Sequence, residues 1–225
     1  MSEQARLLDF IEKWGVSGGT FLDVGCFSGL FLYNARLRGF DVVGIEPSTE
    51  AVSYVRNVYK FEVIHGNLRS GKFAADRFSV VSFLDVIEHL TDPISEMKES
   101  FRILRPGGLL VMTTPNAKGL IQRVVRAKRW LSHEPWCPID NVPWHLWGFT
   151  PHTLSACATK AGFVVKQTEW LEPSPRSSNL GAGSNPAKKL GLSIAALLST
   201  LLGMSDRFAL LAQKPDSAHV LQGGD

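Results

Sequence analysis

Short apolar runs alternate with longer amphipathic stretches through the first two-thirds of the chain. The apolar runs predict strands at Thr20–Val24, Val42–Glu46, Glu62–His65, Phe78–Leu84 and Leu109–Thr114. The amphipathic stretches predict helices at Glu3–Trp14, Gly29–Arg38, Thr49–Val58, Pro93–Leu104 and Pro151–Ala161. This alternation is typical of a parallel sheet flanked by helices. Arg105 to Gly108 reads as a helix stop and turn before the fifth strand.

The alternation breaks after Thr114. Lys118–Leu131 reads as a basic helix, and Trp130–Phe149 is rich in aromatic residues and proline. Two further strands are expected at Phe163–Trp170 and Arg207–Gln213, separated by a loop and an apolar helix over 173–204. We therefore expect one domain over 1–214, followed by a disordered tail over 215–225.

Composition narrows the class of protein. A chain of 225 residues with 44% hydrophobic residues is ordinary for a single globular α/β domain. The net charge of +3 gives no reason to expect a nucleic-acid partner. The three cysteines form no CxxC pair, which argues against a disulfide framework or zinc site and suits a reducing cytoplasm. Residues 190–204 are too few for a spanning helix, which needs about 20 residues.

An acid, a glycine turn and a second acid indicate a nucleoside cofactor. Asp23 ends the first apolar run before Gly25 and Gly29, where backbone can approach a ligand closely. Glu46 ends the next run, where a carboxylate can accept hydrogen bonds from ribose hydroxyls, and Pro47 would lie beside the adenine. Because the acid precedes the glycines and no G-x-G-x-x-G follows, a nicotinamide dehydrogenase is disfavoured.

Five ordered segments resemble class I S-adenosylmethionine-dependent methyltransferases. Asp23–Gly29 is similar to motif I, and Gly44–Ser48 to the ribose-binding strand. Gly66–Leu68, Phe78–Leu90 and Leu104–Val111 resemble the later signatures of the family. The similarity covers Phe21 to Trp170 and the final strand, and is greatest to ubiquinone-biosynthesis and glycan or natural-product O-methyltransferases. These enzymes share the Glu-His-Leu sequence after the fourth strand and a later segment that corresponds to His145–Pro151 of this chain.

The resemblance implies a fold, a cofactor and its binding residues. The fold would be a Rossmann-like, seven-stranded mixed sheet with the last strand antiparallel and helices on both faces. The cofactor would be S-adenosyl-L-methionine, with Asp23 near its ammonium group. The implied cofactor-binding residues are Asp23, Gly25, Cys26, Gly29, Glu46, Pro47, Asn67, Leu68, Leu84 and Asp85.

Three positions depart from the family pattern. Phe27 replaces the middle glycine of motif I, so either the turn is more open or the Phe27 side chain points away from the ligand. Asn67 replaces the usual aspartate, and Ser79 replaces an acid early in strand four. The departures at Phe27 and Asn67 motivate an alternative hypothesis, a methyltransferase-fold scaffold that has lost turnover.

Methyl transfer from a sulfonium is an in-line displacement, which needs alignment of the acceptor with the methyl group and exclusion of water. A base is needed only if the acceptor must lose a proton. The candidate groups are Asp85, Glu88, His89 and His145, and we predict His89 and His145 as catalytic. No ligand set at metal-like spacing is visible, so a metal-free reaction is expected.

The acceptor is predicted only as a class. Residues 117–149 fall where the family inserts its acceptor-binding cap, and Trp136 and Trp144 would form a lid there. The acceptor would be a small molecule, glycan or lipid-linked compound, and attack by oxygen, nitrogen or carbon stays open. The apolar helix could pack on the core, or 189–203 could contact a membrane from the cytoplasm.

Overall fold

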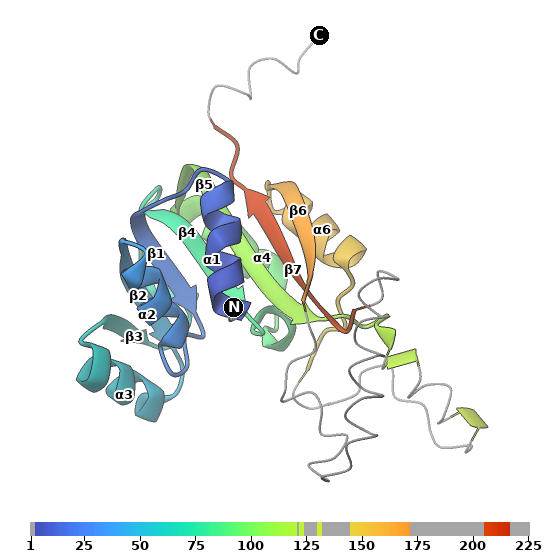
Figure 1. The fold of residues 1–225 in the computed structure, drawn as a ribbon, viewed down its shortest axis with the longest axis horizontal. Coiled ribbons are helices and arrows are strands. Elements are labelled where there is room, and N and C mark those ends of the chain that lie inside the picture. Colours follow the sequence, from blue (N-terminus) through green and yellow to red (C-terminus); the bar gives the residue numbers. More distant parts are fainter. Residues whose placement is uncertain (1–2, 121, 124–129, 132–144, 172–204, 217–225) are drawn as a thin grey trace.

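The computed structural model of the protein describes residues 3–120, 122–123, 130–131, 145–171 and 205–216. These residues form one seven-stranded sheet with helices packed on it (Figure 1). The strands are β1 (Gly19–Val24), β2 (Phe40–Glu46), β3 (Glu62–His65), β4 (Phe78–Leu84), β5 (Leu104–Pro115), β6 (Val164–Leu171) and β7 (Arg207–Gln213). The helices are α1 (Glu3–Lys13), α2 (Leu30–Leu37), α3 (Thr49–Tyr59), α4 (Pro93–Ile103) and α6 (Pro151–Lys160), with 3-10 turns η1 (Leu68–Gly71) and η2 (Ile87–His89).

The strand order is β3-β2-β1-β4-β5-β7-β6. Strands β1 to β5 pair in parallel, whereas β7 pairs antiparallel with both β5 and β6. The predicted mixed sheet with an antiparallel last strand is therefore confirmed. The chain runs outward from β1 through β2 to β3, then returns to start β4 on the other side of β1. Ligands of open α/β sheets bind at such a reversal, outside the carboxyl ends of the strands.

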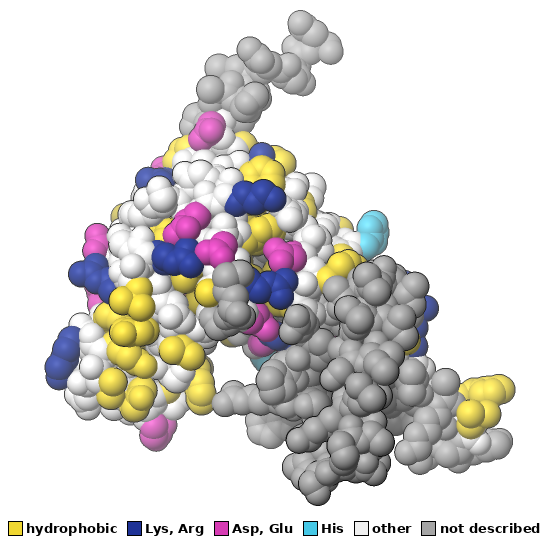
Figure 2. All heavy atoms as spheres, viewed as in Figure 1, with side chains coloured by type: hydrophobic (Ala, Val, Ile, Leu, Met, Phe, Trp, Pro, Cys, Tyr) yellow, Lys and Arg dark blue, Asp and Glu magenta, His cyan; other side chains and the backbone are white. Residues whose placement is uncertain are grey.

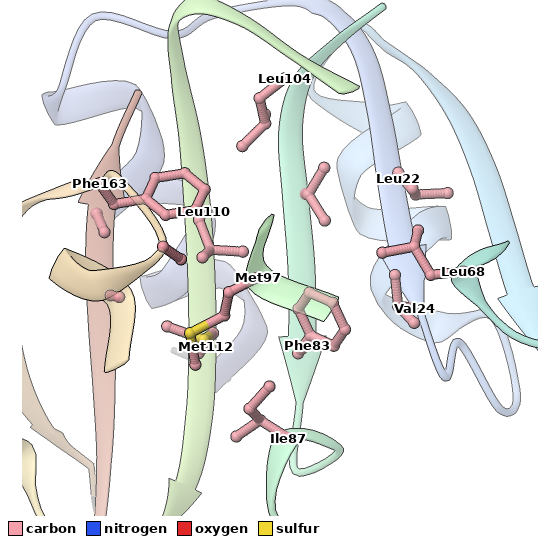
Figure 3. Close-up of a cluster of buried hydrophobic side chains, with 14 of the residues drawn as sticks. Leu22, Val24, Leu68, Phe83, Ile87, Met97, Leu104, Leu110, Met112 and Phe163 are labelled. Carbon is pink, nitrogen blue, oxygen red and sulfur yellow. The ribbon is translucent and has the colours of Figure 1, made fainter. Parts of the chain in front are cut away.

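Successive residues of each central strand pack against helices on opposite faces of the sheet. Phe21 of β1 belongs to the cluster that includes α1, α2 and α3, whereas Leu22 and Val24 belong to the cluster with α4 and α6. Figure 3 shows part of this second cluster, where Met97 of α4 lies over Met112 of β5. Because both faces are covered, the strands are apolar throughout, and the predicted helices on both faces are confirmed.

The helix starts follow local capping chemistry. The Asp92 carboxylate accepts the Ser95 N–H at 3.0 Å and begins α4, and the Thr150 hydroxyl accepts the Thr153 N–H at 3.2 Å and begins α6. A proline follows each cap, where its missing N–H has no consequence. Short-range chemistry of this kind explains why both starts agree with the sequence prediction.

The predicted turn at Arg105–Gly108 is instead a bulge inside β5. Leu104 pairs with Phe78 and Leu109 pairs with Val80, so four residues of β5 lie opposite one residue of β4. The Gly107 N–H donates to the Lys214 carbonyl at 2.9 Å, and Gly107 has a φ of 74°. The sequence prediction was wrong here because contact with the end of β7, distant in the chain, extends the strand through the glycines.

The outer surfaces of the helices differ in character. Figure 2 shows hydrophobic side chains gathered over α2 and α3. Leu37 of α2 and Tyr54 and Val58 of α3 are exposed. Beside α1 the surface is charged, and Arg38 contacts both Asp9 and Glu12. The outer surface near α1 is therefore charged, whereas the outer surface of α2 and α3 carries hydrophobic side chains.

Several predictions lie largely outside the described residues: most of the cap over 117–149, the loop and apolar helix over 173–204, and most of the tail over 215–225. Trp136 and Trp144 fall in that part. Both ends of the cap are described, and the Ala117 N–H donates to the Phe149 carbonyl at 2.8 Å. In the described ranges, no helix has the length and hydropathy needed to cross a membrane.

Candidate active site

The carboxyl ends of β1, β2 and β4 carry the acidic side chains that the sequence singled out. Asp23 of β1 lies in register with Gly44 of β2 and Ser82 of β4. Glu46 ends β2, and Asp85 directly follows β4. Because these strands are parallel neighbours, the three acids lie at one edge of the sheet.

Two glycines shape the turn between β1 and α2. Gly25 has a φ of 75°, and a Cβ there would lie 2.5 Å from a Val86 methyl. Gly29 has a φ of 71°, and a Cβ there would lie 2.9 Å from both Val55 methyls. A side chain at either position would be strained by the backbone and by its neighbours, so this turn requires glycine.

Phe27 keeps the turn conformation although it replaces a glycine. Its φ is 44°, a left-handed value that is unfavourable for a side-chain-bearing residue, and its side chain is 61% exposed. The Phe27 side chain lies at the surface, and its direction relative to the ligand stays a prediction. The Phe27 N–H donates to Glu46 Oε2 and the Ser48 N–H to Glu46 Oε1, both at 2.9 Å. The turn therefore holds the carboxylate predicted to bind ribose.

Asp23 is 3% exposed and accepts a hydrogen bond of 2.6 Å from the Ser82 hydroxyl. Burial raises the pKa of the Asp23 carboxyl to about 7, the Ser82 hydrogen bond opposes the rise, and the nearby Glu46 charge adds to it. A cation beside this carboxylate would stabilise its charged form. The arrangement thus fits an ammonium group, and Ser82, a polar residue within an apolar strand, was missed in the sequence.

The residues predicted on the adenine side differ in exposure. Cys26 is buried, and burial raises the pKa of its thiol. Pro47 is exposed beyond the end of β2. The Asn67 side-chain oxygen accepts the Ser70 N–H at 3.1 Å, and Leu68 is buried in the core. Cofactor contacts by these four residues stay predictions.

The segment that follows β4 is held by ion pairs around the buried Arg207. Asp85, with a φ of 54°, donates its N–H to the Thr113 carbonyl at 3.0 Å, and Leu84 before it packs against the α1 side of the core. The Asp85 carboxylate pairs with Arg207 of β7, which also contacts Glu3 of α1 at 2.8 Å. The pKa of Arg207 is raised despite its burial, because both acids stabilise the charged guanidinium.

This network ties α1 and β7 to the loop that follows β4. Sequence reasoning missed both Arg207 and Glu3, which are 204 positions apart in the chain. A cation at the first position of an apolar strand was the available signal for Arg207. Asp85 therefore has a structural partner, and its predicted contact with the cofactor stays a prediction.

His89 and His145, the predicted catalytic residues, lie together. Their ring centroids are 4.8 Å apart in an edge-to-face arrangement. The segment after His145 is docked on η2, because the N–H groups of Leu146 and Trp147 both donate to the Glu88 carbonyl, at 2.9 and 3.1 Å. Trp147 also donates its indole N–H to the Leu90 carbonyl at 2.7 Å. Burial and the neighbouring His89 lower the pKa of His145, so its ring is neutral near pH 7.

Glu88 completes a cluster with these two histidines. One ligand atom from each of the three side chains lies within 4.8 Å of the others. Glu88 is 1% exposed, and burial raises the pKa of its carboxyl to about 7. The expectation of a metal-free site depended on the absence of ligands at metal-like spacing. That argument does not hold, because the fold brings together residues 56 positions apart.

Comparisons with known proteins identify the family. The family described as "Methyltransferase domain" matches residues 2–168. A ubiquinone biosynthesis O-methyltransferase of Pseudomonas paraeruginosa is 30% identical over 173 residues, covering 73% of this chain and 72% of that protein. Its counterpart in Aeromonas salmonicida is 26% identical over 188 residues, covering 79% and 77%.

Solved structures show the same fold. An S-adenosylmethionine-dependent methyltransferase from Methanosarcina mazei superposes with a TM-score of 0.67 at 20% identity, covering 92% of this chain and 98% of that one. One from Archaeoglobus fulgidus gives 0.63 at 20% identity, covering 94% and 92%. At this identity the likeness shows the fold alone.

The chain belongs to the methyltransferase family and is an S-adenosylmethionine-dependent enzyme. The site fits that cofactor, because Asp23 is a buried carboxylate suited to an ammonium group. Beside it, Gly25 and Gly29 leave the turn free of side chains that would collide with their neighbours. The alternative of a scaffold without turnover is not favoured, since the relatives above are named as methyltransferases.

Proposed function

We propose that this enzyme methylates a hydroxyl oxygen of a small-molecule acceptor by direct in-line transfer. The observation that carries the proposal is the pair of histidines beside Glu88, directly after the β4 exit. A hydroxyl group must lose its proton during methylation, and this cluster is suited to assist that loss. The names of the relatives, ubiquinone biosynthesis O-methyltransferases, support the same choice.

Each part of the site has a defined task in this proposal. S-adenosylmethionine supplies a methyl group already activated on a sulfonium. Asp23 holds its ammonium group, and Glu46 accepts hydrogen bonds from the ribose hydroxyls. The glycines at positions 25 and 29 let the main chain of the turn approach the cofactor closely. The enzyme contributes chiefly by alignment and exclusion of water. His89 and His145 lie beside the acceptor oxygen and assist the departure of its proton.

Turnover against a panel of acceptors tests this proposal. The full chain is incubated with S-adenosylmethionine and phenolic, sugar, quinol and amine acceptors, and S-adenosylhomocysteine release is measured. Transfer to a hydroxylated acceptor is expected. Turnover of amines alone would sink the proposal.

Variants test the role of the histidines. His89→Gln and His145→Gln should lower kcat by roughly 10²-fold or more, the usual contribution of assisted proton transfer, with unchanged affinity for S-adenosylmethionine. His152→Gln is the matched control, because His152 is exposed on α6. Wild-type kcat in both test variants would remove these residues from the chemistry.

We further propose that the acceptor is lipid-linked and that residues 189–203 contact a membrane surface from the cytoplasm. The support is the apolar stripe of this segment in the sequence, which suits an interfacial helix. A variant lacking 189–203 should sediment less with liposomes than the full chain does. Equal sedimentation would contradict membrane contact through this segment and leave the methyl-transfer proposal intact.

A further inference from the structure

We propose that the side chain of Phe27 covers the nucleoside part of bound S-adenosylmethionine and raises the affinity of the enzyme for its cofactor. Phe27 lies in the turn between β1 and α2, at the position where motif I led us to expect a glycine. The inference rests on the part of the proposed function that binds the ribose hydroxyls to Glu46. It gives the Phe27 ring a contact with the cofactor, whereas Gly25 and Gly29 act by leaving room for the main chain.

The first support is the short distance between Phe27 and the carboxylate proposed to bind ribose. The Phe27 N–H donates to Glu46 Oε2 at 2.9 Å. Because N and Cα are bonded at about 1.46 Å, the Phe27 Cα lies at most about 4.4 Å from that oxygen. The Ser48 N–H holds the other carboxylate oxygen at 2.9 Å, so the position of Glu46 relative to the turn is fixed from both sides. A nucleoside whose ribose hydroxyls reach Glu46 is therefore within reach of the Phe27 ring.

The second support is that Phe27 is unfavourable to the fold for two separate reasons. Its φ of 44° lies in the left-handed region, which favours glycine over any residue with a side chain. Its side chain is 61% exposed, so the ring gains little from packing against the protein. Left-handed residues that bear a side chain cluster at sites that bind ligands, where the strain belongs to the function. The fold alone gives no reason for a large apolar residue here, whereas a bound nucleoside does.

The chemistry of the two partners and the area of the ring set the size of the effect. Ribose presents C–H groups and adenine presents a π face, and an aromatic ring can pack on either. An aromatic side chain removes about 150–250 Å² from water when it is fully buried. Covering about half of the exposed part of Phe27 would therefore change the affinity by roughly 10-fold. A glycine at this position would leave that surface of the nucleoside in water.

Calorimetric titration of the full chain with S-adenosylmethionine and S-adenosylhomocysteine measures this contribution. Phe27→Ala should bind both compounds roughly 10-fold more weakly, whereas Phe27→Tyr, which keeps the ring, should bind them as the wild type does. The heat-capacity change of binding should be less negative in Phe27→Ala, because less apolar surface leaves water. Leu37→Ala is the matched control, since Leu37 is an exposed apolar residue at the end of α2 that is distant from the turn, and its affinity should be unchanged. Urea unfolding shows that each variant is folded.

Two outcomes overturn the contact between the Phe27 ring and the nucleoside. One is wild-type affinity in Phe27→Ala. The other comes from methylthioadenosine, which lacks the amino-acid part of the cofactor and should lose the same factor in Phe27→Ala; unchanged binding of this compound would place the ring against the methionine part instead. Glu46→Gln separates these failures from a failure of the proposed function. Wild-type affinity in Glu46→Gln would contradict the placement of the ribose, whereas wild-type affinity in Phe27→Ala alone contradicts only the ring contact.

Discussion

Replacing Asp23 by asparagine should stabilise the ligand-free protein at alkaline pH while weakening its binding of S-adenosylmethionine. Burial raises the pKa of Asp23 to about 7, against 3.8 for the model carboxyl. Between these values the folded protein binds more protons at this residue than the unfolded chain does. The free energy of unfolding therefore falls as pH rises through this window and levels off above about pH 7.

The magnitude follows from the shift. One pKa unit corresponds to about 1.4 kcal/mol, so the full effect of Asp23 is about 4 kcal/mol, of which about 2–3 kcal/mol falls between pH 5 and pH 8. Asparagine can still accept the Ser82 hydrogen bond, but it does not ionise. The loss of stability from pH 5 to pH 8 should therefore be about 2–3 kcal/mol smaller in Asp23→Asn than in the wild type.

Urea unfolding at pH 5 and pH 8 measures this difference. Asp41→Asn is the control, because Asp41 is exposed and pairs with the surface Arg36. Groups with similar shifts, such as Glu88, are common to all three proteins and cancel in the comparison. Equal pH dependence in Asp23→Asn and the wild type would refute the reasoning.

The same carboxylate should release its proton when the cofactor binds. At pH 6 Asp23 is largely protonated in the ligand-free protein, and the ammonium group of S-adenosylmethionine favours the ionised form. Calorimetric titration in buffers of different ionisation enthalpy should show proton release by the wild type and much less by Asp23→Asn. The affinity of the variant should be at least roughly 10-fold weaker, the effect of about 1.4 kcal/mol.

Three further substitutions probe the architecture. Phe27→Gly should raise the free energy of unfolding by about 1 kcal/mol in urea, because a left-handed φ is relieved and the lost side chain is mostly in solvent; a lower value would contradict this. Gly29→Ala should cost more than about 2 kcal/mol and weaken cofactor binding, since its Cβ would meet Val55 at 2.9 Å. Asp85→Asn should cost about 1–3 kcal/mol in thermal unfolding, because buried Arg207 keeps only Glu3; an unchanged midpoint would show that the pair contributes nothing.

Local patterns predicted most of the fold. Strands β3, β4 and β7 begin and end where their apolar runs do, and α4 and α6 begin at a polar cap followed by proline. Both signals depend on residues near in the chain. The bulge at Arg105–Gly108 was misread as a turn, because its hydrogen bonds to Lys214 come from a distant segment.

In the candidate site, too, some features followed from the sequence and others only from the tertiary structure. By itself the sequence determined the order of acids and glycines at the strand ends, which indicates a nucleoside cofactor because parallel strands place their carboxyl ends at one edge. The resemblance of its ordered motifs to a known family added the fold and the methyl donor. Only the tertiary structure decided that Ser82 contacts Asp23, that Arg207 joins Asp85 to Glu3, and that His145 meets Glu88 and His89. Those contacts join residues 56 to 204 positions apart in the chain. No short-range pattern encodes which of many polar side chains will meet once the helices pack on the sheet.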